Sequence, residues 1–380
     1  MIRLLTAGES HGKALSVIID GMPAGLKIKT DYIDNELHRR QKGYGRGGRM
    51  KIETDKVEIL SGVRFGETIG SPISIQIKNK DFENWKDIME TSEGATDKKI
   101  TSPRPGHADL PGVLKYGRTD IRDILERASA RETASRVAAG GVFKLFLREF
   151  GINIYSHTIS IGEIGIKKSE KSFEETEDTP LRCTDSEAEK EMIELIDEAA
   201  KKGDSLGGVN EIIARGVCPG IGSHAHHDRR LSSSIASAMM SIPSVKGVEI
   251  GEGIENAKKF GSKVHDEILY SDEKGFYHST NRAGGIEGGM SNGEDIKIRI
   301  HIKPVSTLSS PLKSADLITK KQTPAAKERA DICVVPAAGA IAESMLAYVL
   351  SNAFLEKFGG DCLKDIKANY SSYIERIVNV

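Results

Sequence analysis

The sequence predicts an α+β protein in which helices and strands form a layered sandwich. Two segments alternate apolar and polar residues with a period of two, ISIQIK at 73–78 and IKIRIHIK at 296–303, as strands with one buried face do. Segments with helical spacing are grouped between and after these strands, rather than following each strand singly. That order favours a layered α+β sandwich over a doubly wound parallel sheet.

The N-terminal part of the chain predicts two strands and one helix. Residues 2–5 and 15–19 have strand character on either side of the glycine-bearing turn GESHG. Asp31 is expected to cap a short helix that ends near Gly43. The polar segment 80–101 predicts a long surface excursion.

The rest of the chain is predicted to be richer in helix. The longest helical pattern runs over 120–150, with apolar residues and alanines recurring at helical spacing. The acidic segment 169–179 predicts a solvated loop. Further helices are predicted at 186–202, 228–240 and 337–358.

Composition and charge narrow the class of protein. The chain has 380 residues, 38% of them apolar, which is enough to bury a sizeable core. It carries 54 Lys and Arg against 55 Asp and Glu, and this balance argues against a general binder of nucleic acid or membrane surfaces. The sequence has no apolar run of the roughly 20 residues that a membrane span needs, and no signal peptide. We therefore expect a soluble cytoplasmic protein.

The domain organisation is predicted to be simple. No linker rich in Pro, Gly or Ser divides the chain, so a single domain over 1–380 is expected. The segments VIIDGMPAG at 17–25 and EIIARGVCPG at 211–220 resemble each other and indicate a weak internal repeat of about 1–150 and 205–350.

The turn GESHG at 8–12 has the pattern G-x-S-x-G, which is the nucleophile elbow of serine hydrolases. An elbow follows several strands and opens a helix, whereas this turn begins at the eighth residue and precedes a strand. Two interpretations remain, a structural turn and a loop that presents His11 to a ligand. Histidine can deliver a proton to a leaving group near neutral pH.

The glycine-rich segment HRRQKGYGRGGRM at 38–50 concentrates basic residues. Three interpretations stand for it: a solvated basic face, an RGG-type RNA-binding segment, and an anion site where backbone N–H groups and guanidinium groups converge. The basic residues are Arg39, Arg40, Lys42, Arg46 and Arg49.

Arginine recurs beside an imidazole, a carboxylate or a second arginine in the segments SPRPGHAD, ERASARE and KERAD. Arg127 and Arg131 are four residues apart, which predicts that they share one face of the long helix. This repetition indicates a polyanionic small molecule that is handled with proton transfer. The pairs are Arg104 with His107, Arg127 with Arg131, and Arg329 with Asp331.

Other motifs point away from metals and nucleotides. HAHHD at 224–228 has no second cluster at ligand spacing, so no metal site is predicted. No P-loop is present, and GGIEGG within 283–294 precedes a strand, unlike a dinucleotide fingerprint.

Eight segments resemble, in order, the motifs of the chorismate synthase family: GESHG, GYGRGGRM, SPRPGHAD, RASARETASRVAAG, GDSLGG, SIPSVKGVEIG, NRAGGIEGGMSNGE and KPVST. The resemblance implies a β-α-β sandwich with a central helical layer between antiparallel sheets, a homotetramer and one reduced FMN per subunit. It also implies a lyase of the shikimate pathway of aromatic amino-acid biosynthesis. The implied reaction is 1,4-anti-elimination of phosphate from 5-enolpyruvylshikimate 3-phosphate, which forms chorismate.

The resemblance also implies site residues. Its catalytic residues fall on His11, which would protonate or stabilise the leaving phosphate, on His107, which with Lys303 would stabilise reduced flavin, and on Asp331, which would relay the C6 proton. Its substrate or NADP contacts fall on Ser10, Arg40, Arg46, Arg49, Arg104 and Arg131. Its flavin contacts fall on Arg127, Ala128, Ser129, Pro243, Ser244, Gly288, Lys303, Pro304, Val305, Ser306, Thr307 and Arg329.

Three positions depart from the family pattern. Many members have two serines at Ala128–Ser129, Asn or Gln followed by Ala at Pro243–Ser244, and a larger residue at Ala330. No separate reductase domain is recognisable, so NADPH is expected only as the source of electrons for an external reductant.

Overall fold

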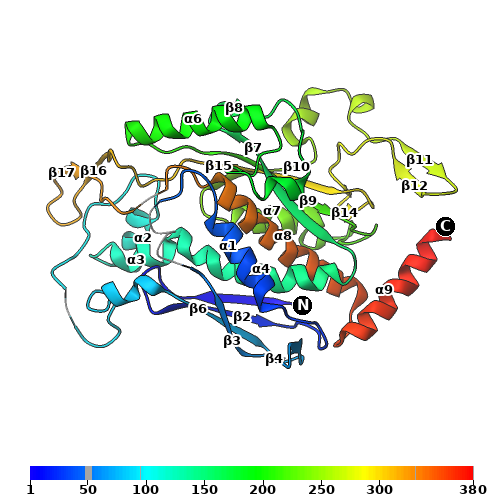
Figure 1. Ribbon diagram of the computed structural model, residues 1–380, viewed down its shortest axis with the longest axis horizontal. Coiled ribbons are helices and arrows are strands. Elements are labelled where there is room, and N and C mark those ends of the chain that lie inside the picture. Colours follow the sequence, from blue (N-terminus) through cyan, green and yellow to red (C-terminus); the bar gives the residue numbers. More distant parts are fainter. Residues whose placement is uncertain (48–53, 95, 330, 380) are drawn as a thin grey trace.

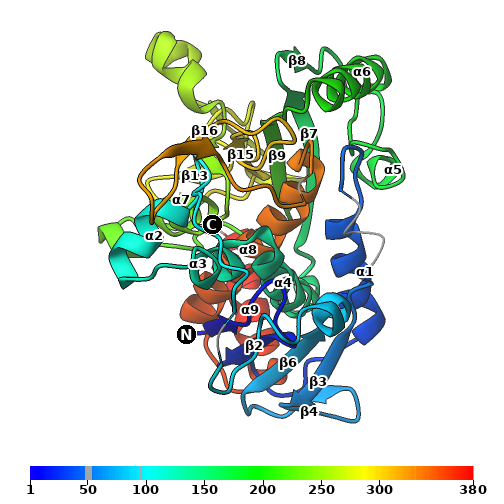
Figure 2. The same cartoon turned by 90° about the vertical axis from the view of Figure 1, so that its left-hand side faces the viewer.

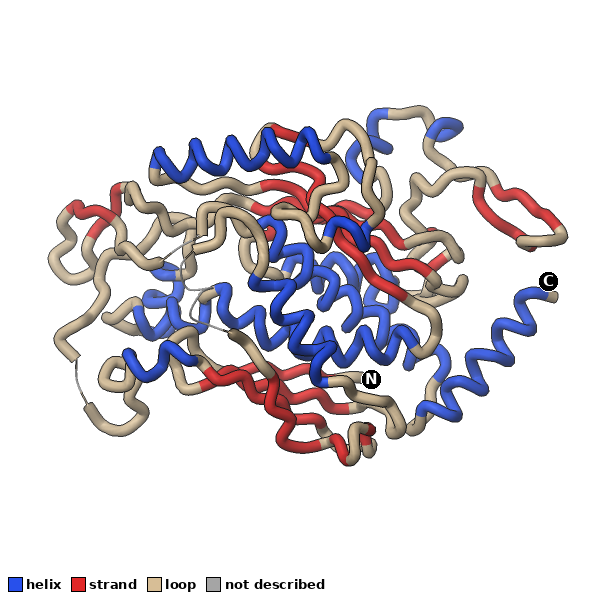
Figure 3. The backbone as a smooth tube through the Cα atoms, viewed as in Figure 1, coloured by secondary structure: helices blue, strands red, loops and turns tan. Residues whose placement is uncertain are grey.

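The computed structural model describes residues 1–47, 54–94, 96–329 and 331–379. Its core has two antiparallel sheets with a layer of helices between them (Figure 1). The same three layers are seen in the view turned by 90° (Figure 2) and in the trace coloured by element type (Figure 3). The predicted layered α+β sandwich is confirmed.

The first sheet has the strand order β1-β2-β6-β3. Val17 and Ile19 of β2 and Ile73 and Ile75 of β6 are buried, while the residues between them are more exposed, so the period-two pattern at 73–78 marks a strand with one buried face. The strands are β1 Arg3–Ala7, β2 Ala14–Asp20, β3 Val57–Ser61 and β6 Ile73–Lys78, with a small hairpin of β4 Val63–Arg64 and β5 Glu67–Thr68.

The second sheet has the order β10-β15-β9-β7-β8, and β15 buries every second residue. Three two-stranded hairpins project from the sandwich. The sheet strands are β7 Asn153–Ile161, β8 Ile164–Gly165, β9 Gly208–Arg215, β10 Val245–Ile250 and β15 Ile296–Ile302. The hairpins are β11 Ile268–Ser271 with β12 Gly275–His278, β13 Ile286–Glu287 with β14 Met290–Ser291, and β16 Lys313–Ala315 with β17 Gln322–Pro324.

The two sheets have the same connectivity in their four main strands. In the first sheet, β1-β2-β6-β3, the first strand in the chain pairs with the second, the second with the fourth, and the fourth with the third. The second sheet repeats this order as β7-β9-β15-β10. Between the second and third strands of each set the chain forms a helix, α1 (Thr30–Gln41) or α7 (Leu231–Met240). A long helix, α4 (Thr133–Arg148) or α8 (Val335–Phe358), follows the fourth strand.

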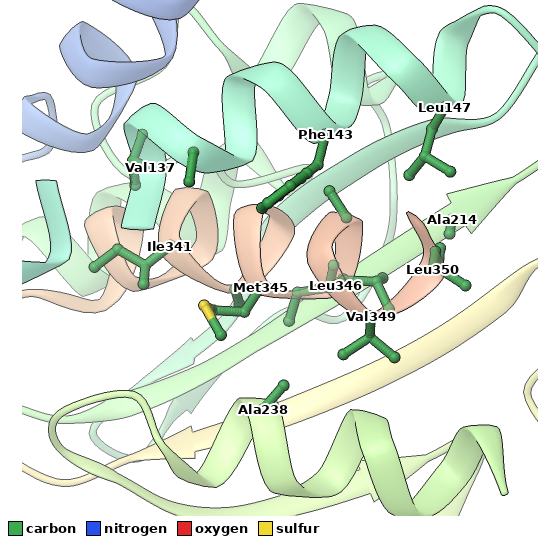
Figure 4. Close-up of a cluster of buried hydrophobic side chains, with 14 of the residues drawn as sticks. Val137, Phe143, Leu147, Ala214, Ala238, Ile341, Met345, Leu346, Val349 and Leu350 are labelled. Atoms are coloured by element: carbon green, nitrogen blue, oxygen red, sulfur yellow. The ribbon is translucent and has the colours of Figure 1, made fainter. Parts of the chain in front are cut away.

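The central layer consists of α1 Thr30–Gln41, α4 Thr133–Arg148 and α8 Val335–Phe358. Val137 and Phe143 of α4 point toward α8, while Met345 and Val349 of α8 face α7 near Ala238 (Figure 4). A Cβ atom added to Gly140 would lie 2.2 Å from the Cβ of Ser344, so α4 and α8 can approach closely only because this residue is glycine.

Helix α8 is apolar on all sides. By length and composition it could cross a membrane, contrary to the expectation that no apolar segment is that long. However, 78% of its most apolar window is buried within the protein, as expected for the core helix of a sandwich. Its apolar character is therefore explained by burial against α4, α7 and the second sheet.

The remaining helices surround the sandwich, and α9 packs at one end of α8 (Figure 1). The helix predicted at 186–202 matches α6. The helix predicted at 228–240 is shorter in the structure, because the separate 3-10 turn η4 precedes α7. The α-helices are α2 Asp109–Tyr116, α3 Arg122–Ala128, α5 Phe173–Thr176, α6 Ser186–Lys202, α7 Leu231–Met240 and α9 Leu363–Val378. The 3-10 helices are η2 Lys80–Asn84, η3 Ala130–Glu132, η4 His227–Arg229, η5 Gly253–Lys258 and η6 Gly261–Lys263.

The single helix predicted over 120–150 is wrong, because the chain is extended at Ser129 (φ −65°, ψ 144°). The segment divides there into α3, η3 and α4, and the hydroxyl group of Ser129 caps η3 by accepting from the N–H of Arg131. Arg127 and Arg131 therefore do not share a helix face. Local helical spacing could not reveal this break, which turns the Ser129 region into the wall of a cavity.

Three smaller expectations also needed correction. Helix α1 begins at Thr30 without a side-chain cap, and Asp31 lies in its first turn. The acidic segment 169–179 contains the short helix α5, which has a capping box between Ser172 and Glu175. The segment 80–101 starts with η2, whose Asp81 is buried.

A buried network of ion pairs joins the helices of the central layer. Glu343 of α8 has no exposed side-chain surface and pairs with Arg39 of α1, Lys144 of α4 and Arg182. Burial disfavours its charge, but these three cations outweigh that effect and hold the pKa of Glu343 well below its usual range. Glu36 and Glu177 complete the network by pairing with Arg39.

Candidate active site

A cavity of about 330 Å³ lies where the sheets' loops meet the helical layer. Its walls come from eight separate parts of the chain, including the turn between β1 and β2, the segment after α1 and the residues just before α8. The predicted site residues that line it are Ser10, His11, Arg40, Arg46, Arg104, His107, Ala128, Ser129, Arg131, Pro243, Ser244, Lys303, Val305, Ser306, Thr307, Arg329 and Asp331. The fold thus brings together residues up to about 320 positions apart, Ser10 and Asp331 among them.

His11 is held by a carboxylate of α3. Its Nδ1 atom lies 2.9 and 3.0 Å from the two carboxylate oxygens of Glu126, and its backbone N–H donates to the same group. Burial disfavours the charge of Glu126, but the hydrogen bonds from His11 outweigh it and lower the pKa of Glu126. The ring of His11 also stacks on Trp85, with the ring centroids 4.0 Å apart.

His107 is held in the same way by the acid at the start of α2. Its Nδ1 atom lies 2.5 Å from Oδ1 of Asp109, which is fully buried. Arg104 donates to the same carboxylate from Nε and Nη2, at 2.8 and 3.0 Å, and to Thr307 from Nη1. Burial opposes ionisation, yet the bonds from His107 and Arg104 lower the pKa of Asp109 well below its usual range.

Two buried arginines meet at Asp55. Arg131 donates from Nη1 to both carboxylate oxygens at 2.7 Å, and Arg40 lies 3.8 Å from one of them. Arg40 is fixed by bonds to Thr133 and Ala130, but its Nη1 atom has no hydrogen-bond partner among the described residues. Burial, with the charge of Arg131, lowers the pKa of Arg40 to about 9. A second anion beside Arg40 would relieve this excess of positive charge.

Asp331 pairs with the segment after α1 rather than with Arg329. Its carboxylate accepts from the backbone N–H of Gly47 at 2.6 Å and lies 2.9 Å from Nη1 of Arg46. Arg329 instead lies 3.8 Å from Asp81 of η2, and most of its side chain is exposed. The two residues are close in sequence but contact different partners.

Lys303 and Ser244 form another wall of the cavity. Burial, together with the charge of Lys246, lowers the pKa of Lys303, and within the described chain no carboxylate pairs with it. Ser244 has a φ of 70°, a strained conformation for a residue with a side chain, and its carbonyl accepts from the N–H of Lys303 at 2.9 Å. A strained residue beside an unpaired cation is typical of a ligand-binding wall.

Three predicted contacts do not line the cavity, and a fourth lies outside the described residues. Arg127 donates to the carbonyls of Thr6 and Gly8, and thereby ties α3 to β1. Gly288 and Pro304 do not line the cavity of the single chain. Arg49 lies outside the described residues.

Several residues that form the site were not foreseen. Glu126 and Asp109 stand within motifs that were recognised, and the spacing of His107 and Asp109 was a signal that could have been used. Trp85 and Asp55 come from polar segments with no pattern of their own, so only the fold reveals them.

A possible metal cluster lies elsewhere. Within the described chain, the one group of side chains spaced to hold a metal ion is His226, His227 and Asp228, all exposed. None of them lines the cavity, and Nδ1 of His226 already lies 2.7 Å from Oδ1 of Asp228.

The cavity has the features that reduced FMN requires. Small and apolar side chains, including Leu125, Ala128 and Val334, offer a wall for a flat ring system. Lys303, without a carboxylate partner, and the hydroxyl groups of Ser306 and Thr307 are suited to anionic and polar groups of such a cofactor.

This arrangement is suited to an enzyme site for a multiply charged small molecule, because it combines arginines that can hold anions with two carboxylate-held histidines that can transfer protons. The family model of chorismate synthase matches residues 2–355. The chain belongs to the chorismate synthase family, and the protein is a lyase.

Relatives and a solved structure agree with this assignment. The chain is 51% identical over 384 residues to a chorismate synthase of Carboxydothermus hydrogenoformans, with both chains covered fully. It is 54% identical over 389 residues to one of a Sulfurihydrogenibium species, again with full coverage of both. A crystal structure of chorismate synthase superimposes with a TM-score of 0.82 at 42% identity, covering 100% of this chain and 99% of the other.

Proposed function

We propose that this protein converts 5-enolpyruvylshikimate 3-phosphate into chorismate and phosphate by an anti-1,4-elimination that depends on reduced FMN. The observation that carries the proposal is the cavity itself, where an excess of buried arginine meets two carboxylate-held histidines. Membership of the chorismate synthase family supports it. The step would complete the part of the shikimate pathway shared by the aromatic amino acids.

The arginines would bind and orient the substrate. The substrate carries two carboxylates and a phosphate, and guanidinium groups bind such groups through paired, charge-assisted hydrogen bonds. Arg40 offers a buried N–H group for this purpose. Arg46, Arg104 and Arg131 line the same cavity, and Ser10 adds a hydroxyl group.

The histidines and Asp331 would move or hold protons. His11 would donate a proton from Nε2 to the leaving phosphate oxygen, because its Nδ1 is occupied by Glu126. His107, held by Asp109, would with Lys303 stabilise negative charge on the cofactor side of the cavity. Asp331 would accept the C6 proton once the bonds from Arg46 and Gly47 have shifted toward the substrate.

Reduced FMN would be held by Ala128, Ser129, Pro243, Ser244, Lys303, Pro304, Val305, Ser306, Thr307 and Arg329. When bound it supplies electron density to the ring system as the C–O bond breaks, with no net oxidation or reduction. Arg127 would contribute indirectly, by fixing the Ala128–Ser129 backbone. Gly288 would be a further flavin contact, and it would reach the flavin only in the assembled homotetramer. The flavin would be reduced externally, with NADPH as the electron source.

The oligomeric state, location and evolution of the chain are part of the proposal. We infer a cytoplasmic homotetramer that acts on a small molecule and needs no nucleic acid, membrane or metal. The chain would be one domain, built from two copies of a four-strand, two-helix unit, and the second copy would begin at β7 (Asn153–Ile161) rather than at about residue 205 as the sequence predicted. The shared connectivity of the two sheets supports this, because the similar segments 17–25 and 211–220 begin in the corresponding strands β2 and β9.

The decisive experiment is anaerobic conversion of 5-enolpyruvylshikimate 3-phosphate by the purified protein, with chemically reduced FMN and with oxidised FMN in parallel. Formation of chorismate only with reduced FMN is the expected result. No product with either form, from protein with a native circular dichroism spectrum, would show that the cavity serves another anionic ligand.

A further inference from the structure

Glu126 contacts His11 at three points. Its two carboxylate oxygens lie 2.9 and 3.0 Å from Nδ1 of the ring, and Oε2 also accepts from the backbone N–H of His11 at 2.8 Å. The backbone N–H of Ser10 donates to the carbonyl of Glu126 at 2.9 Å. An ionised carboxylate can only accept hydrogen bonds, so Nδ1 of His11 must carry a hydrogen. Nε2 is left as the nitrogen that can react in the cavity.

Trp85 fixes the plane of the same ring. The rings of Trp85 and His11 are stacked, with an interplanar angle of 24°. The indole is itself held by a hydrogen bond to Asp81 of η2, and the guanidinium group of Arg122 lies 4.8 Å from its ring centroid. Trp85 is the only tryptophan of the chain. Its fluorescence therefore reports on the surroundings of His11.

We propose that Glu126 is the positioning residue of His11, which keeps the ring in the Nδ1–H form, aims Nε2 into the cavity and favours the doubly protonated imidazolium. This inference deepens the proposed function, because the imidazolium is the form that can donate a proton to a leaving phosphate. The pair joins two segments 115 residues apart, the turn GESHG and helix α3. This contact thus links His11, the proposed proton donor, to the helix that also carries Arg122, Arg127 and Ala128.

The charged groups around His11 come from three elements. Helix α3 supplies Glu126 and Arg122, which itself pairs with Glu126 at 2.9 Å. Asp81 of η2 interacts electrostatically with His11. Glu328 and Arg329, before α8, pair with Arg122 and Asp81. Among these groups Glu126 is the one that hydrogen-bonds the ring, so it is the group whose removal tests the proposal.

The test is a pH titration of Trp85 fluorescence in the full-length, flavin-free protein. A protonated imidazole stacked on an indole quenches its fluorescence, so the wild type should brighten as the pH rises through the titration of His11. Glu126→Gln keeps the shape of the side chain but removes its charge. We expect its midpoint to move to lower pH by about one unit, which corresponds to a tenfold weaker preference for the imidazolium.

Three further variants complete the titration. His11→Asn should abolish the pH-dependent change in Trp85 fluorescence. Its loss would show that the change in the wild type reports on His11. Asp123→Asn removes an exposed carboxylate from the same helix, where it pairs with Arg118, and should leave the midpoint unchanged. Glu126→Asp retains a charge, and its midpoint should lie between those of the wild type and Glu126→Gln. An unchanged midpoint in both folded Glu126 variants overturns the proposal.

The activity of Glu126→Gln separates positioning from a merely structural role. Its kcat should fall at high pH and recover toward the wild-type value as the pH is lowered, because protonation of His11 is restored. An equal loss at every pH overturns the proposal. The fluorescence shift does not need the reaction, so a shifted midpoint in a protein that forms no chorismate supports the positioning role and refutes only the proposed function.

Discussion

The Nδ1 atom of His107 lies 2.5 Å from Oδ1 of Asp109, and the same buried carboxylate accepts two hydrogen bonds from Arg104. One acid thus holds both the imidazole and a guanidinium group at the cavity wall. His11 is held by Glu126 in a similar way, together with Arg122. Each histidine of the site therefore has its Nδ1 occupied by an acid of the fold.

Asp109 should make the stability of the protein depend on pH in the acid range. Its pKa is lower in the folded protein than the value of about 3.9 in an unfolded chain. Its stabilising contribution is therefore present above about pH 4 and is lost as the pH falls further. Asp109→Asn should lower the free energy of unfolding by about 3–5 kcal/mol at neutral pH, because Arg104 stays buried without its acid. That difference should narrow below about pH 4 in urea unfolding experiments.

The exposed Asp123 supplies the matched control for this measurement, since Asp123→Asn should change the free energy of unfolding little at any pH. A constant difference between Asp109→Asn and the wild type down to about pH 2 would contradict the assignment.

His11→Ala should lower turnover by roughly 10²–10⁴, the usual contribution of a general acid. FMN binding should remain largely intact, because the proposed flavin contacts lie on other residues. The measurements are anaerobic kcat with reduced FMN and flavin affinity by fluorescence. A loss of FMN binding as large as the loss of turnover would refute the role of His11 as an acid.

Arg40→Lys should raise the KM for the substrate about 10- to 100-fold, because a charge-assisted hydrogen bond contributes about 1.5–3 kcal/mol. Lysine keeps the charge but cannot bond Thr133, Ala130 and an anion at the same time, as the guanidinium group can. Steady-state kinetics at saturating reduced FMN would measure the effect. Unchanged KM in a folded variant would mean that the unpaired N–H of Arg40 does not meet the substrate.

Glu343→Gln should destabilise the protein by about 3–5 kcal/mol, because Arg39, Lys144 and Arg182 would be left buried around a neutral group. Urea unfolding at neutral pH measures the change. Glu198→Gln breaks an exposed pair with Lys202 and should change the free energy of unfolding little. Equal effects of the two substitutions would rule out a structural role for the buried network.

Gly140→Ala should destabilise the protein by about 1–3 kcal/mol or more, since the new methyl group would overlap the side chain of Ser344. Thermal and urea unfolding would detect the change. Combining it with Ser344→Gly should recover part of the loss, because the closest contacts are the Cβ and Oγ atoms of that serine. If the double variant recovers no stability, the strain does not arise from the contact with Ser344.

Much of the fold followed from local patterns. The alternation at 73–78 and 296–303 and the helical spacing at 186–202 predicted β6, β15 and α6 closely, since each buries one face against the core. The break at Ser129 was not predictable in this way, because the residues around it favour helix. In the structure the Ser129 hydroxyl caps η3 and also bonds the hydroxyl of Ser10.

The site was predictable wherever a motif carried the reactive group itself. His11, Arg40, Arg104, His107 and Asp331 all lie in recognised segments and line one cavity. Their partners were harder to foresee, because Glu126 and Asp55 act through contacts between distant segments. The pairing of Asp331 with Arg46 rather than Arg329 has the same cause.

The long stretch of chain between α4 and α8 affects how the protein must fold during its synthesis. Helix α8 packs on α4, α7 and the second sheet, yet about 190 residues separate it from α4. Until it has left the ribosome, these apolar surfaces lack their main partner and are open to aggregation. The cavity cannot close earlier either, since Asp331 and Val334 directly precede α8. Such long-range closure predicts slow folding and an interval in which the nascent chain depends on chaperones.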